Sequence, residues 1–277
     1  MGALMAQRLH DAGVPLAVAD LSEEALAPFA AQGIPVAQHA ADLPGAVVMT
    51  MLPTGAHVRA ALLGEGGACT VLPRSAVIDM STASPEETVA LAAELAALGT
   101  TLLDAPVSGG MAGARAGTLL AMAGGDAAVF DRCLPLLLAF CSDAMLVGPV
   151  GSGHIVKALN NFLSAVTLWS STEALVVGTR LGLDPAAMLK VWTRGTGRSH
   201  ATEVKLPDHV LTRRFDFGQT LALFCKDIGI AADLAARTDT ATPALDAILA
   251  NWEGLRDTLG GGEDITAVAK RIETSKR

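Results

Sequence analysis

The chain has 277 residues, of which 51% are hydrophobic and 17% charged, and its formal net charge is −8. This length allows one large domain or two ordinary domains with a substantial core. The negative charge argues against a nucleic-acid partner, which would need a concentrated basic surface. The apolar stretch 155–178 contains Lys157, two asparagines and Glu173. A helix in the core of a bundle therefore fits this stretch better than a membrane span.

The cysteines and histidines favour no metal site. The four cysteines form neither a CxxC pair nor a zinc spacing, and the histidines include no HExxH motif. We interpret the cysteines as buried, reduced thiols. The N-terminus has no signal-peptide pattern, because Arg8, His10 and Asp11 come too early. These features predict a cytoplasmic protein that is not attached to a membrane.

Residues 1–150 alternate short apolar runs with Ala-rich helical segments. Four runs are predicted to be buried parallel strands: 16–20, 46–52, 76–80 and 101–104. Helical patterns lie between them, and the one over 84–98 opens with Ser-Pro-Glu-Glu, a typical helix start. This alternation predicts a doubly wound, Rossmann-like α/β domain. Residues 118–123 and 144–147 could add strands at an edge of its sheet.

The beginning of the chain is unusual for such a domain. A helical pattern runs from Met1 to Gly13, and no strand precedes it. Asp20 follows Gly2 across a helix and a strand, about the interval at which a Rossmann unit places its ribose-binding acid. In that interpretation Gly2 is the third glycine of G-x-G-x-x-G, and the first strand and two glycines are missing. An ordinary helix cap and an ordinary strand-end aspartate are the alternative.

Three further turns follow predicted strands at their carboxyl ends. They are Leu52-Pro53-Thr54, Ser81-Thr82, and the stretch from Asp104 to Gly110 that contains Ser108-Gly109-Gly110. Ligands of open α/β sheets bind at this edge. A hydroxyl beside unobstructed backbone N–H groups at Ser108-Gly109-Gly110 suits a carboxylate. Each turn alone could serve only the backbone, but their shared placement favours a ligand site.

From Gly151 onward helical periodicity replaces the strand signals, so we predict an all-helical domain over 151–277 that begins with a long helix. The predicted segments are 152–181, 184–192, 208–213, 217–237, 243–259 and a tail over 265–272. The Gly- and cation-rich loop 193–200 contacts an anionic ligand or is a solvated loop. Lys226-Asp227 interrupts an apolar helix, and a buried charged pair is costly unless it is well paired. A charged surface stripe is the alternative.

The stretch 151–161, Gly-Ser-Gly-His-Ile-Val-Lys-Ala-Leu-Asn-Asn, opens the long helix. Asn160 and Asn161 follow Lys157 by three and four positions, so all three side chains share a helix face. A lysine beside carboxamides on an apolar helix can act as a proton donor and acceptor. The alternative is a surface lysine whose methylene stem lies along the helix.

The chain resembles the β-hydroxyacid dehydrogenase family, typified by 3-hydroxyisobutyrate dehydrogenase and tartronate semialdehyde reductase, over essentially its whole length. The stretches 104–110 and 151–161 match the family's substrate and catalytic signatures. The resemblance implies that Lys157 is the general acid/base and Asn161 its partner. It implies that Ser108, Gly109 and Gly110 hold the substrate carboxylate.

The same resemblance assigns the cofactor-binding residues. They are Gly2, Asp20, Leu52, Pro53, Ser81, Thr82 and Lys226, with Lys226 closing over the bound cofactor and substrate. Met1-Gly2-Ala-Leu-Met-Ala matches only the end of the family's glycine motif, so the first strand of the sheet is expected to be absent from this numbering. No metal is expected.

The resemblance implies oxidation of a small 3-hydroxy acid, or reduction of the matching semialdehyde. Asp20 would accept hydrogen bonds from ribose hydroxyls and repel a 2′-phosphate, so NAD is expected in preference to NADP. An imine reductase shares the architecture but usually replaces the lysine, and the shortened glycine motif alone favours a catalytically weak cofactor-binding relative. The related decarboxylating phosphogluconate dehydrogenase has a much longer C-terminal part. A homodimer or homotetramer through the helical domain is expected.

Overall fold

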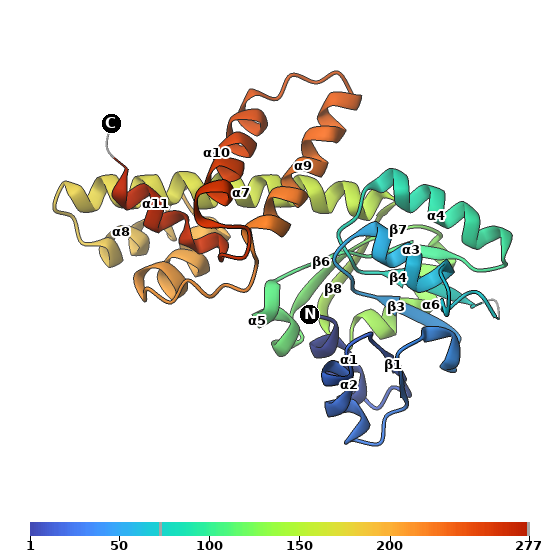
Figure 1. Ribbon diagram of the computed structural model, residues 1–277. Helices are drawn as coiled ribbons and strands as arrows, with labels where there is room; N and C mark the ends of the chain where they lie inside the picture. Colours follow the sequence, from blue (N-terminus) through green and yellow to red (C-terminus); the bar gives the residue numbers. More distant parts are fainter. Residues whose placement is uncertain (72–73, 276–277) are drawn as a thin grey trace. The chain divides into compact units, whose positions relative to one another are not determined.

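The computed structural model describes residues 1–71 and 74–275 of the chain (Figure 1). The chain divides into two units, Met1–Lys157 and Ala158–Arg277. The first unit alternates strands and helices, and the second is built from helices. We predicted a domain boundary after residue 150, which is where helix α7 (Ser152–Arg180) begins, and this helix continues from the first unit into the second.

The first unit contains strands in the order expected from the sequence, with several short ones in addition. The strands are β1 (Val18–Ala19), β2 (Val36–Ala37), β3 (Val47–Thr50), β4 (Ala76–Asp79), β5 (Leu102–Asp104), β6 (Val107–Ser108), β7 (Leu119–Gly124) and β8 (Cys141–Gly148). The helices are α1 (Gly2–Asp11), α2 (Glu23–Ala30), the 3-10 turn η1 (Ala40–Asp42), α3 (Gly55–Leu63), α4 (Pro85–Ala97), α5 (Gly110–Ala116), α6 (Ala127–Leu137) and the start of α7.

Among the described residues, the main sheet has six strands in the order β3-β4-β5-β7-β6, and β8 also pairs with β7. Strands β3, β4 and β5 are parallel, so their carboxyl ends lie at the same edge. The prediction that 118–123 forms an edge strand is wrong in its placement. Strand β7 has partners on both sides: β5 and β6 pair with it in one antiparallel register, and β8 pairs with it in parallel on the opposite side.

Strands β1 and β2 form a separate parallel pair. Within residues 1–71 and 74–275, no strand joins this pair to β3.

Helices cover both faces of the main sheet, as the doubly wound prediction requires. Successive strand residues point to opposite faces. Ile78 and Leu103 pack in the cluster that α1, α5 and α6 complete. Their neighbours Val77 and Leu102 pack in the cluster of α3 and α4. The strand sequences are therefore continuous apolar runs, because both faces of the sheet are buried.

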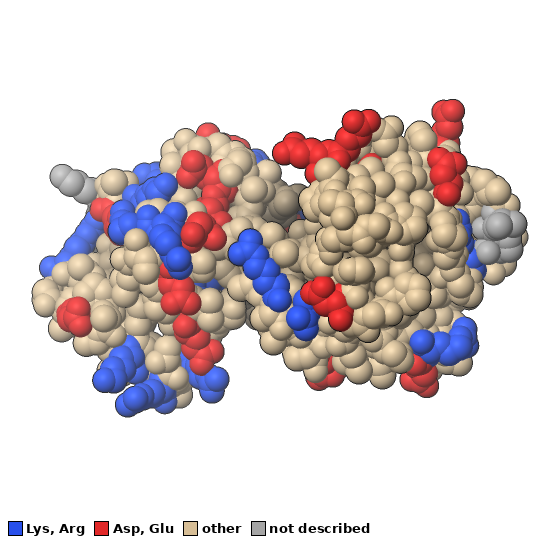
Figure 2. Space-filling view, turned by 90° about the horizontal axis from the view of Figure 1, so that it is seen from below, with Lys and Arg blue, Asp and Glu red and all other residues tan. Residues whose placement is uncertain are grey.

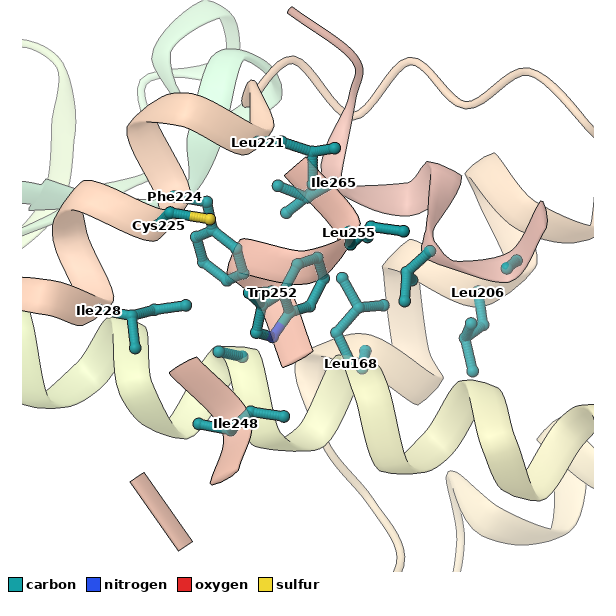
Figure 3. Close-up of a cluster of buried hydrophobic side chains, with 14 of the residues drawn as sticks. Leu168, Leu206, Leu221, Phe224, Cys225, Ile228, Ile248, Trp252, Leu255 and Ile265 are labelled. Atoms are coloured by element: carbon teal, nitrogen blue, oxygen red, sulfur yellow. The ribbon is translucent and has the colours of Figure 1, made fainter. Parts of the chain in front are cut away.

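The second unit has one helical core. After most of α7 come α8 (Pro185–Trp192), the π-helix η2 (Ala201–Leu211), α9 (Leu221–Arg237), α10 (Pro243–Leu259), the 3-10 turn η3 (Ile265–Ala267) and α11 (Val268–Thr274). Figure 3 shows Trp252 in this core among Phe224, Leu168 and Ile248. The rings of Trp252 and Phe224 meet edge to face, with centroids 4.9 Å apart. With few aromatic residues, one fully buried indole organises much of the core.

Two predicted helices of this unit needed correction. The segment predicted as 208–213 begins earlier, because η2 covers Ala201–Leu211 with Pro207 inside it. Proline disrupts an α-helix interior, so the wider turn of a π-helix is the local solution. The helix predicted from Phe217 begins at Leu221, after Thr220, whose hydroxyl accepts a bond from the Leu223 N–H.

The surface charge, the helices and the positions of metal-binding side chains bear on the partners that the sequence argued against, namely nucleic acid, a membrane and a metal ion. On the face in Figure 2, Lys and Arg side chains are interspersed with Asp and Glu. No helix in the described part of the chain is long and apolar enough to cross a membrane. Within the described residues, no group of three or more His, Cys, Asp or Glu side chains could hold a metal ion.

Candidate active site

The loops after β3 and β4 are joined through one buried aspartate. The Leu52 N–H donates to Ser81 Oγ at 2.9 Å. The Ser81 N–H donates to Asp79 Oδ1 at 3.0 Å, and Thr50 Oγ1 donates to the same oxygen at 2.8 Å. Asp79 is 2% exposed. The Asp79 carboxylate thus fixes the two loops that the sequence predicted to bind cofactor.

Gly2 and Asp20 occupy different surroundings. A side chain at Gly2 would lie 3.6 Å from Met51 Cβ, so the start of α1 packs beside the residue that precedes Leu52. Asp20 follows β1 directly and is exposed, and its Oδ1 accepts a bond from the Ser22 N–H at 2.9 Å. The structure therefore brings Gly2 to the Leu52 loop, whereas the hydrogen bond between Ser22 and Asp20 is local.

The Ser108-Gly109-Gly110 turn links β6 to α5. Gly109 has φ of 128° and Gly110 has φ of 64°, conformations that other residues rarely adopt. A Cβ at Gly109 would also lie 3.0 Å from Leu119 Cδ2. Ser108 is partly exposed. The turn therefore presents a serine hydroxyl beside a backbone without side chains, which suits an anionic group.

Asp104 caps the beginning of α7. Its Oδ1 accepts the Gly151 N–H at 2.7 Å, and its Oδ2 accepts the His154 N–H at 2.9 Å. Burial raises the pKa of the Asp104 carboxyl above its ordinary value, against the opposing effects of His154 and of these two bonds. A carboxylate at a helix N-terminus also interacts favourably with the helix dipole. Asp104 thus holds the catalytic signature against the end of β5.

Gly153, the second glycine of this stretch, allows α7 to approach the ends of β5 and β7 closely. A Cβ at Gly153 would lie 2.2 Å from the Met122 carbonyl oxygen and 2.9 Å from the Asp104 carbonyl oxygen. Any larger residue would force the helix away from β5 and β7. The glycine at position 153 therefore follows from the packing of α7 on the strand ends.

Lys157 and Asn161 are one turn apart on α7. Lys157 is half-buried and Asn161 is buried. Asn161 Nδ2 donates to Asp227 Oδ2 at 2.8 Å. A carboxylate only accepts hydrogen bonds, so the amide nitrogen must face Asp227 and the amide oxygen must face away from it.

The Lys226-Asp227 doublet is paired, and its aspartate is buried. Lys226 Nζ lies 3.2 Å from Asp227 Oδ1, and Asp227 is 5% exposed. The surface-stripe alternative is therefore wrong for Asp227. In the loop 193–200, Arg198 forms an exposed ion pair with Glu203 at 2.6 Å.

Two family models and many known proteins match this chain. Residues 1–148 match the model of the NAD-binding domain of 6-phosphogluconate dehydrogenase, and residues 151–272 match the NAD-binding model of NADP-dependent 3-hydroxyisobutyrate dehydrogenase. The 2-(hydroxymethyl)glutarate dehydrogenase of Eubacterium barkeri is 35% identical over 98% of this chain and 91% of its own length. The chain belongs to the β-hydroxyacid dehydrogenase family.

Two further relatives of this family are similar over nearly the full length. The 3-hydroxyisobutyrate dehydrogenase of Pseudomonas aeruginosa is 35% identical over 98% of this chain and 94% of its own. The Mycobacterium tuberculosis 3-hydroxyisobutyrate dehydrogenase, solved with L-serine, superposes with a TM-score of 0.88 at 31% identity, covering 99% of this chain and 96% of its own. The chain is an NAD(P)-dependent hydroxyacid dehydrogenase, which confirms the predicted fold class and enzyme class.

The sequence analysis did not identify several residues that organise the predicted site. Asp79 and His154 were not singled out, although both are buried polar residues next to predicted site residues. The available signals were an aspartate that ends an apolar strand and a histidine inside the glycine signature. The role of Asp227 in orienting Asn161 depends on a contact between distant segments, which the sequence does not reveal.

A cavity of about 240 Å³ lies beside α3 and α4. Asp79, Thr88, Glu87 and Arg59 contribute to its wall. None of the predicted site residues is among the residues that line it. We therefore do not assign the cofactor or the substrate to this cavity.

Proposed function

We propose that this dehydrogenase oxidises acids of the form HOCH₂–CH(R)–COO⁻ to the corresponding semialdehydes, or reduces the semialdehydes, with NAD. The names of two relatives support this substrate class. 2-(Hydroxymethyl)glutarate and 3-hydroxyisobutyrate both carry a primary alcohol on the carbon next to the one that bears the carboxylate. L-Serine, present in the mycobacterial structure, has the same arrangement.

The Ser108-Gly109-Gly110 turn would hold the substrate carboxylate. The serine hydroxyl and the backbone N–H groups donate hydrogen bonds, and the left-handed glycine conformations keep side chains away from the anion. Because the turn would contact only the carboxylate of the substrate, this mode of binding is compatible with a small R group.

Lys157 would move the proton. In the oxidation its amine takes the proton of the substrate hydroxyl as the C–H hydride leaves the same carbon, and in the reduction its ammonium returns that proton. Asn161, whose nitrogen is fixed on Asp227, can present its amide oxygen to the ammonium or to the substrate hydroxyl. The observation that carries the proposal is the anchored start of α7: the His154 N–H is bonded to Asp104, and Lys157 follows His154 by one turn.

The residues present also fit a dinucleotide. The loops after β3 and β4 lie at one edge and are hydrogen-bonded to each other, and the exposed Asp20 carboxylate follows β1. NAD, when bound, supplies the hydride acceptor. Asp20 would accept bonds from the ribose hydroxyls, and its charge disfavours a 2′-phosphate, which supports NAD over NADP.

Lys157→Ala tests the proposed chemistry. We expect kcat to fall by about 10²–10⁴-fold, with nearly unchanged NAD affinity, because the lysine acts on the substrate proton. Turnover of 3-hydroxyisobutyrate and fluorescence titration with NADH measure the two quantities. Lys190→Ala, the same change at an exposed position of α8, is the control. A Lys157→Ala enzyme with near-normal kcat across pH would refute the role.

A further inference from the structure

His154 is a fully buried imidazole three residues before Lys157 on α7. Its Nε2 lies 2.9 Å from the Ser81 carbonyl oxygen, and its Nδ1 lies 2.8 Å from Thr88 Oγ1. A carbonyl oxygen only accepts, so Nε2 must carry a proton and donate it. The ring therefore connects α7 to the loop after β4 and to α4.

The contact with Ser81 places His154 at the junction of the predicted site. Ser81 Oγ accepts the Leu52 N–H, and the Ser81 N–H donates to Asp79. The His154 N–H itself donates to Asp104 Oδ2. One residue thus joins the two cofactor loops and the end of β5 to the helix that carries Lys157.

We propose that His154 is a positioning residue that sets the first turn of α7, and with it Lys157, against the cofactor loop at Ser81. The inference rests on the proposed function of Lys157. His154 Nε2 lies 3.9 Å from Asp79 Oδ2, and Nδ1 lies 3.8 Å from Asp104 Oδ2. Both are longer than ordinary hydrogen bonds. The ring therefore acts through its bonds to Ser81 and Thr88. The bond to the Ser81 carbonyl oxygen needs a donor at Nε2, and the bond to Thr88 Oγ1 needs a donor or an acceptor at Nδ1.

This role makes the bond from His154 Nε2 to Ser81 decisive. A glutamine side chain places an amide near the position of Nε2 and can donate to Ser81, whereas leucine fills similar space without a donor. Because a misplacement of about 1 Å can cost roughly 10²-fold in rate, we expect His154→Leu to lower kcat by about 10–100-fold. His154→Gln should stay within a few-fold of wild type. The KM for the hydroxy acid should change little in both, since the Ser108 turn holds the carboxylate.

If His154 only stabilised the fold, the variants would show a different pattern of kcat and melting temperature. Thr88→Val removes the partner of Nδ1 but keeps the Ser81 contact, so we expect a lower melting temperature with nearly unchanged kcat. If activity instead follows melting temperature across Thr88→Val, His154→Gln and His154→Leu, the positioning role is wrong. Should His154→Leu fail to fold, His154→Asn replaces it, because its shorter amide can reach Thr88 but not Ser81.

The experiment is steady-state kinetics and thermal melting of these variants beside His39→Leu, an exposed histidine in the same unit. A glutamine variant as impaired as the leucine variant would overturn the hydrogen-bonding role, as would a leucine variant with normal kcat. Lys157→Ala in the same assays separates the two ideas. If it is inactive while His154→Leu is fully active, only the positioning role fails; if it is active, both fail.

Discussion

We propose that the preference between the two nicotinamide cofactors depends on Asp20. We expect Asp20→Ala, and Asp20→Asn combined with Leu21→Arg, to reduce or reverse the preference for NAD. The carboxylate would no longer repel a 2′-phosphate, and a charge contact near a surface is worth on the order of 1–4 kcal/mol. The ratio of kcat/KM for the two cofactors should therefore change by about fivefold or more.

The control for this prediction is Asp42→Ala, which removes an exposed acid in η1 of the same unit. Its cofactor preference should equal that of the wild type. A wild-type enzyme that already prefers NADP would contradict the assignment of Asp20, whatever the variants do.

The thiols give a second prediction at the scale of single residues. Cys69, Cys133, Cys141 and Cys225 are all buried and unbonded to one another. Burial raises the pKa of the Cys141 thiol to about 12 and raises the pKa of the other three thiols as well. Since only the thiolate is nucleophilic, labelling by a disulfide reagent at pH 8 should be slow in the native enzyme. After denaturation four thiols should react, and rapid labelling of the native enzyme would contradict the burial.

At the scale of single elements, the cap on α7 should contribute strongly to stability. Asp104→Ala leaves the Gly151 and His154 N–H groups without their carboxylate partner in a buried place. We expect the free energy of unfolding to fall on the order of 3 kcal/mol, because an unsatisfied buried donor costs about 1–3 kcal/mol. Urea unfolding followed by circular dichroism measures this change.

Asp126→Ala is the matched control for the α7 cap. Asp126 caps α6 through a bond from the Val129 N–H at 2.9 Å, but it is exposed. Water can replace its carboxylate, so the loss should be about 1 kcal/mol. Equal losses in the two variants would mean that the burial of Asp104 does not matter.

The elements also show what the sequence could predict. Buried parallel strands such as β4 and β5 form apolar runs of the right length, and the glycine signature correctly predicts the start of α7. Two-residue strands such as β2 and β6 leave no periodic pattern, and the π-helix η2 is not typical of any local sequence. The contacts of Asp79, His154 and Asp227 join segments far apart in the chain, so only the folded structure identifies them.

At the scale of the whole molecule, the outer face of α7 suggests how copies associate. Leu159, Leu163 and Val177 are 44%, 61% and 57% exposed. At about 100° per residue these positions fall on one side of the helix, away from Lys157 and Asn161. Exposed apolar side chains gathered on one helix face favour a protein interface. The expected homodimer or homotetramer would bury this face.

We therefore predict that the combined change Leu163→Asp and Val177→Asp converts the oligomer to monomer. Burying a leucine or valine contributes about 1.5–3 kcal/mol, so losing two, with charges in their place, should weaken association by 100-fold or more. Sedimentation equilibrium over a range of concentrations measures it. Leu21→Asp, which changes an 80% exposed leucine of the first unit, should leave the mass unchanged. A monomeric wild type, or an unaltered oligomer in the double variant, would place the interface elsewhere or remove it.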